Sequence, residues 1–160
     1  MMTDSSFNSD CGTATESDPR KLLTDGGTGK GLVTFESDAT VSDSVQRVKE
    51  VLEEKDAIRL MAEIDHEANA ATVDRDLRPT TVLVFGNPDV GTPLMQSAPS
   101  LAIDLPMKLL VMEADDGTVT VSYNDPAYLA DRHDLTGEDE RLETAADALS
   151  TLAAVAAGKA

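Results

Sequence analysis

Two histidines are the first residues to consider for chemistry, because a neutral imidazole can act as an acid, a base or a metal ligand near neutral pH. His66 lies in AEIDHEANA (62–70), directly after Asp65 and three positions before Asn69. If 66–70 is helical, His66 and Asn69 share a face. Asp65 cannot be assumed to orient the ring, because neighbouring side chains on a strand point to opposite faces. A hydrogen-bonded helix-start or dimer-contact role for His66 is favoured over a functional role.

The sequence offers no complete set of residues for metal binding or nucleophilic catalysis. A zinc site needs three protein ligands, but the single cysteine, Cys11, lies in a polar segment and His133 is remote from His66 in sequence. No GxSxG motif supports Ser97, Ser100 or Ser122 as the serine of a Ser/His/Asp triad. We therefore predict no metal and no cofactor.

Two alternative roles for His66 stay open. A small metabolic or stress-related enzyme could use His66 as a general acid or base, with Asp65 beside it. Haem or metal binding could also use His66, or Met95 for haem, although the chain has no CxxCH motif and few aromatic residues for a haem pocket. Whether the protein is an enzyme stays open, and the incomplete set of catalytic groups favours a non-enzymatic role.

Polar residues at predicted turns are candidates for a small pocket. GNPDVGTP (86–93) is read as turn punctuation with Thr92 capping the next helix, although backbone N–H groups there could also hold an anion. Tyr123 and Asn124 likewise end a predicted strand. We expect a small polar pocket near His66, Asn87 and Tyr123. Its candidate residues are His66, Asn69, Asn87, Thr92, Asp104, Tyr123 and Asn124.

The elements that must position these residues follow from the hydrophobic pattern. Strands are predicted over 31–37, 57–65, 80–87, 107–114 and 118–123, and the hairpin signal Asp116-Gly117 joins the last two. The nearly all-apolar run 80–87 should be central. Strict alternation in 57–65 would place Ile58, Leu60, Ala62 and Ile64 on one face.

Helical spacing predicts the remaining elements. A helix begins near Thr40, where Asp43 completes an acidic capping box. A short helix follows His66 and ends by Pro79, and a broken helical segment spans 94–106. A final helix covers 138–157. The fold class is therefore α+β, with an antiparallel-rich sheet in strand, helix, four strands, helix order and helices mainly on one face.

Composition limits the domain organisation and the classes of partner. The 160 residues, of which 41% are hydrophobic, are enough for one compact domain, which we place at 31–160. Residues 1–30 are read as a flexible acidic and polar tail, and GTGKG within it lacks the strand, spacing and Ser or Thr of a phosphate loop. The formal charge of −17 disfavours nucleic-acid and membrane-surface partners.

The acidic residues also bear on the host. They are spread over the whole chain, with few lysines, which favours a protein adapted to a salt-rich cytoplasm. No run approaches the roughly 18 apolar residues needed to span a bilayer, and the N-terminus has no secretory signal pattern. We expect a cytoplasmic, halophilic protein.

Several long motifs together resemble one family. IDHEANA, LRPTTVLVFGNPDVGTPLM, AIDLPMKLLV and SYNDPAYLADRH resemble the family of domain of unknown function 302 (DUF302) over residues 31–135, and weakly to 157. The resemblance implies the strand, helix, four strands, helix order of the TATA-binding-protein-like fold group, and it implies no DNA binding. The motif positions include His66, Asn87, Asp104, Tyr123 and His133.

The function expected from the sequence is a non-enzymatic small-ligand-binding or interaction domain. The ligand would be small and polar, and the partner would be a second copy of the chain. A homodimer is expected because the second face of the sheet has few helices left to cover it.

Overall fold

The computed structural model describes residues 29–160. The strands are β1 (Leu32–Ser37), β2 (Arg59–Asp65), β3 (Thr80–Gly86), β4 (Met107–Glu113) and β5 (Val119–Asn124). The helices are α1 (Val41–Glu53), α2 (His66–Ala71), α3 (Pro88–Ser97), α4 (Pro126–Arg132) and α5 (Asp139–Ala157), with a 3-10 helix η2 (Pro99–Ile103). Cys11 and all but the last two residues of the predicted tail lie outside the described residues.

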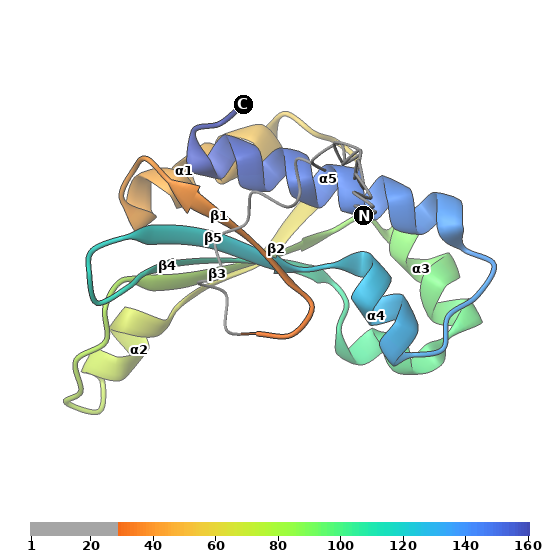
Figure 1. Cartoon of the computed structure of the whole chain (residues 1–160), viewed down its shortest axis with the longest axis horizontal. Coiled ribbons are helices and arrows are strands. Elements are labelled where there is room, and N and C mark those ends of the chain that lie inside the picture. Colours follow the sequence, from red (N-terminus) through yellow and green to blue (C-terminus); the bar gives the residue numbers. More distant parts are fainter. Residues whose placement is uncertain (1–28) are drawn as a thin grey trace, which may run out of the picture.

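The five strands form one antiparallel sheet in the order β1-β5-β4-β3-β2. Helices α1 and α5 lie side by side over one face, α2 lies at one end, and α3 and α4 lie at the other end (Figure 1). The predicted α+β class, strand order along the chain and one-sided helix cover are confirmed. The predicted central strand, β3, is an internal strand, but β4 occupies the middle of the sheet.

The main core lies between the sheet and the pair α1 and α5. Alternate side chains of β3 are buried, which is the period of a strand with one covered face. Fully buried aliphatic side chains from each layer meet there, among them Val48, Leu83, Leu109, Val111, Val121, Leu149 and Leu152. A second apolar cluster beyond the end of the sheet joins α3, η2 and α4 through Leu94, Leu101 and Leu129. This second cluster fixes the loops that surround the candidate site.

Two side-chain caps decide where helices begin. The Thr40 hydroxyl accepts a hydrogen bond from the Asp43 backbone N–H at 3.1 Å, so the predicted start of α1 is confirmed. The predicted cap at Thr92 is wrong, because α3 already begins at Pro88 and contains Thr92. Asn87 is the cap, since its Oδ1 accepts from the Asp89 N–H at 3.0 Å. Asn at the cap with Pro in the first turn is a strong start signal.

A bulge in β2 overturns the predicted alternation of that strand. Leu60 pairs with Phe85 but Ala62 pairs with Val84, so the register shifts by one residue around Met61. Leu60 therefore points to the helix-covered face, whereas Ala62 and Ile64 point to the opposite face. All seven residues of β2 are exposed, as expected for an edge strand.

The second face of the sheet carries an apolar centre. By alternation it presents Val82, Val84, Leu110 and Met112, each half-buried. Within the described residues, helix cover on this side is limited to α2 near one end of β3 (Figure 1). We call these side chains, with the outward Ala62 and Ile64 of β2, the open sheet face; the outward Thr34 of β1 and Ser122 of β5 are buried and bond to each other at 2.8 Å.

Candidate functional site

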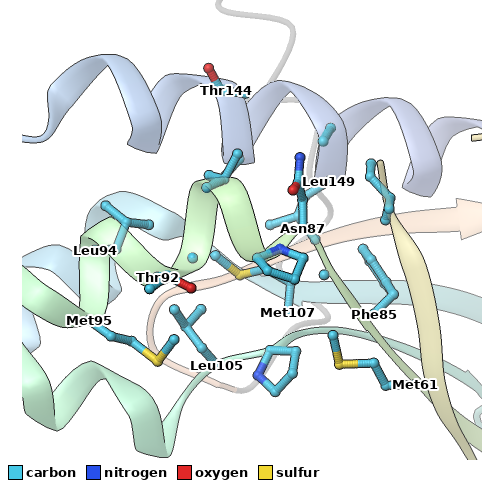
Figure 2. A pocket seen from close by; sticks show the side chains of 18 residues that line it. Met61, Phe85, Asn87, Thr92, Leu94, Met95, Leu105, Met107, Thr144 and Leu149 are labelled. Atoms are coloured by element: carbon cyan, nitrogen blue, oxygen red, sulfur yellow. The ribbon is translucent and has the colours of Figure 1, made fainter. Parts of the chain in front are cut away.

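A cavity of about 280 Å³ lies where β3 ends and β4 begins, beside α3 and under α5. Its wall is mainly apolar and includes Phe85, Leu94 and Leu149 together with three methionines, Met61, Met95 and Met107. Figure 2 shows these methionines on different elements around the cavity, with α5 running over it. Met61 is 51% exposed, so the cavity reaches solvent beside it. We call this space the methionine-lined cavity.

Local sequence explains why this space stays open. The chain leaves β3 at Gly86, turns at Asn87 and enters α3, where Gly91 lines the cavity. A Cβ placed on Gly91 would meet only the Leu105 Cδ1 atom, at 3.8 Å, which is ordinary van der Waals contact. Gly91 thus contributes room that most other residues would fill.

Few polar groups face the methionine-lined cavity. Its side-chain hydrogen-bonding groups belong to Asn87, Thr92 and Thr144, and both threonines are exposed residues. The Asn87 Oδ1 atom is already engaged as the cap of α3. The flexible, polarisable thioethers of methionine adapt to apolar ligands of different shape. The cavity is therefore chemically suited to a small apolar molecule.

A second group of functional side chains lies outside this cavity, between η2 and α4. His133 Nε2 lies 2.5 Å from Asp104 Oδ2, and His133 Nδ1 lies 2.8 Å from the Ser100 hydroxyl. Arg132 Nη1 lies 3.2 Å from both carboxylate oxygens of Asp104. We call these four residues the His133 cluster. The sequence singled out Asp104, but it set Ser100 aside for want of a GxSxG motif and His133 because it is remote from His66 in sequence.

Comparison with known proteins identifies the family. The model for "Domain of unknown function DUF302" matches residues 33–157. This chain belongs to the DUF302 family. The crystal structure of an uncharacterized conserved DUF302 protein from Bacillus stearothermophilus superimposes with a TM-score of 0.70, covering 80% of this chain and 99% of that chain. The two sequences are 16% identical, so this similarity shows the shared fold alone.

Curated relatives carry a different kind of name. Two proteins named "Fluoride-specific ion channel FluC 1", from Brucella suis and Brucella abortus, are 36% identical to this chain over 129 residues. The match covers 80% of this chain but only 50% and 47% of theirs. The chain therefore spans about half the length of these relatives. None of the helices in residues 29–160 combines the length and apolarity needed to cross a membrane.

The DUF302 fold separates the residues that the sequence grouped into one polar pocket. Asp65, next to His66, pairs with Thr81, whereas Arg59 at the other end of β2 pairs with Gly86, next to Asn87. His66 and Asn87 therefore lie at opposite ends of β3. Tyr123 is buried on the helix-covered face and stacks on Phe35, with 6.5 Å between ring centroids. The polar pocket expected around His66, Asn87 and Tyr123 is thus not formed.

The individual candidates have different surroundings. Asn87 and Thr92 line the methionine-lined cavity, and Asp104 belongs to the His133 cluster. Asn69 is exposed on α2, and Asn124 is half-buried at the end of β5. The cavity walls that sequence reasoning missed, chiefly Met61 and Met107, carry no local signal, because a methionine on a strand is more often a core residue.

His66 is the first residue of α2 and is half-buried. Asp65 is the cap of this helix, because its Oδ1 accepts a hydrogen bond from the Ala68 N–H at 2.9 Å. The predicted helix-start position of His66 is confirmed, but its ring makes no hydrogen bond within the part of the chain that the structure describes. Among residues 29–160, His, Cys, Asp and Glu side chains form no group of three that could hold a metal ion.

Proposed function

We propose that this DUF302 domain is a non-enzymatic binding domain that holds a small, mainly apolar molecule in the methionine-lined cavity. The observation that supports the proposal is the combination of a 280 Å³ space, an apolar wall and an opening beside Met61. Ligand sites in proteins are typically concave and apolar with a few polar groups that fix orientation. The Asn87 amide nitrogen and the Thr92 hydroxyl would supply those groups here, since the Asn87 Oδ1 atom caps α3 and the Thr144 hydroxyl donates to the Glu140 carbonyl at 2.9 Å.

The size of the cavity sets the size of the ligand. An apolar cavity of about 150 Å³ accommodates benzene. The methionine-lined cavity is larger, at about 280 Å³, so a molecule of roughly ten non-hydrogen atoms fits. Apolar burial of a ligand this small supports dissociation constants from about 10 μM to 1 mM. We propose an apolar ligand in place of the polar one expected from sequence, because the wall offers so few hydrogen-bonding groups.

We also propose that the domain is a homodimer through the open sheet face. Five strands about 4.8 Å apart, each about 20 Å long, give a face of about 24 by 20 Å before side-chain relief is counted. That flat area, about 480 Å², is smaller than the roughly 800 Å² that each partner buries in a standard interface, so the proposed dimer is a small one. In a chain of formal charge −17, this face is mostly uncharged, so two copies can meet there with little repulsion.

The same charge supports the remaining parts of the proposal. Thirty acidic residues against thirteen basic ones suit a protein that works in concentrated salt, where screening removes mutual repulsion. We propose a cytoplasmic protein of a halophilic host on this ground.

Ligand binding can be tested by calorimetric titration of the protein with indole in molar potassium chloride. The Gly91→Leu variant should lose measurable affinity, because the new side chain would enter the cavity. Ala68→Leu is the matched control, since it adds the same side chain to an exposed position of α2 at the other end of the sheet. Equal affinity of parent and Gly91→Leu would refute the cavity as the site. The dimer is tested separately by light scattering, where a monomer mass at micromolar concentration would exclude it.

A further inference from the structure

The His133 cluster has a defined direction of hydrogen bonding. A carboxylate can only accept, so the 2.5 Å contact with Asp104 places the imidazole proton on Nε2. When the ring is neutral, Nδ1 then carries a lone pair that can accept a hydrogen bond from the Ser100 hydroxyl, which lies 2.8 Å away. A hydroxyl, a base in contact with it and a third group that orients the base are the arrangement found around activated nucleophiles.

Packing beneath the cluster holds these groups in place. Ser100 lies in η2, Asp104 directly follows η2, and His133 is the C-cap residue directly after α4. Leu101 and Leu129, each 2% exposed, anchor these two elements in the second apolar cluster. The contact geometry is thus set by two buried aliphatic side chains on neighbouring elements.

Exposure differs along the cluster in the way that a nucleophile requires. Ser100 is exposed, whereas the side chains of His133 and Asp104 are 7% and 14% exposed. A molecule from solvent can therefore reach the hydroxyl while the base stays shielded. The cationic groups that face Asp104 are Arg132, which bonds its carboxylate, and Lys108, whose Nζ donates to its backbone carbonyl at 3.1 Å. Both fix the position of Asp104.

We propose that Ser100 is a nucleophile, with His133 as its general base, which accepts an acyl group from small activated esters. The Ser100 Oγ atom bonds to the ester carbonyl carbon while its proton passes to His133 Nδ1. The bond between that carbon and the leaving oxygen then breaks, and His133 returns the proton to the leaving group. The product is an acyl-serine, with no oxidant or reductant consumed. This reactivity is distinct from ligand binding, because Ser100 and His133 do not line the methionine-lined cavity.

The test is the rate and position of acetylation by p-nitrophenyl acetate, followed by release of p-nitrophenol and by peptide mass mapping. Mapping should place the acetyl group on Ser100 and should separate it from any acetylated lysine. Ser100→Ala should abolish that adduct, and His133→Gln should slow its formation by about tenfold or more, because Gln cannot take up the proton.

Ser97→Ala is the matched control. Ser97 is also exposed and hydrogen-bonded, but it donates to the Glu138 carboxylate at 2.9 Å and has no imidazole beside it. Its removal should leave the acetylation rate unchanged. Thermal melts of each variant would show that the fold is intact. An unacetylated Ser100 in the parent, or an undiminished rate in a normally folded His133→Gln protein, would overturn the proposal.

Discussion

Replacing Gly91 by alanine should stabilise the protein, because the structure leaves room for the new methyl group. Gly91 lies inside α3, where its N–H donates to the Asn87 carbonyl at 2.9 Å. Alanine is favoured over glycine within a helix by about 0.8–1 kcal/mol. The added Cβ would lie 3.8 Å from the Leu105 Cδ1 atom, so no steric cost offsets this gain. We expect the free energy of unfolding to rise by about 1 kcal/mol.

The same substitution at Gly31 provides a contrast. Gly31 has φ of 77°, a left-handed conformation that alanine rarely adopts, and a Cβ there would collide with the Tyr128 ring. Gly31→Ala should therefore destabilise the fold by about 1–3 kcal/mol. Urea unfolding in molar potassium chloride measures both changes. A Gly91→Ala protein that unfolds at lower urea than the parent would refute the described cavity wall.

Three further outcomes follow from the described contacts and charges. His66→Gln should change the free energy of unfolding, measured by chemical denaturation, by less than about 0.5 kcal/mol, because His66 is half-buried and its ring makes no hydrogen bond within residues 29–160. A loss of about 1–2 kcal/mol would instead support the sequence-based expectation of a hydrogen-bonded His66. The melting midpoint should rise between dilute and multimolar potassium chloride, and a constant midpoint would contradict the halophilic proposal. A hydrogen bond from Arg47 lowers the pKa of Asp38, and hydrogen bonds from Arg141 and Ser97 lower the pKa of Glu138, so this part of the stability is present above the unfolded-state pKa and is lost as the pH falls below about 4. In thermal melts at acidic pH, the Arg47→Gln variant should lose less stability over this range than the parent. Identical stability-versus-pH profiles would contradict a contribution from the Arg47–Asp38 hydrogen bond.

Local signals predicted much of the fold. The Thr40 cap, the Asp116-Gly117 hairpin and the nearly all-apolar run of β3 all depend on neighbouring residues, and each predicted its element correctly. The bulge in β2 was not predictable, because it depends on how β2 pairs with β3, a strand about 25 residues later in the chain. The start of α3 was misplaced because Thr92 and Asn87 are both good caps, and only the backbone path distinguishes them.

The candidate site depended even more on contacts between distant parts of the chain. Asn87 and Thr92 were recognisable from their turn context, but the methionine-lined cavity also takes walls from β2, β4 and α5. The His133 cluster joins Asp104 to a histidine 29 residues later, a contact that depends on how α4 packs on η2. Polar residue types alone grouped His66 with Asn87, although the register of β2 and β3 places them apart.

Binding of an apolar molecule in the methionine-lined cavity is tested most directly by NMR of methyl-labelled methionines during titration with indole. Met61, Met95 and Met107 line the cavity, whereas Met112 lies on the open sheet face and serves as an internal control. The proposal predicts saturable shifts of the first three methyl resonances, with Met112 unchanged. Absence of shifts at millimolar indole, or shifts confined to Met112, would contradict it.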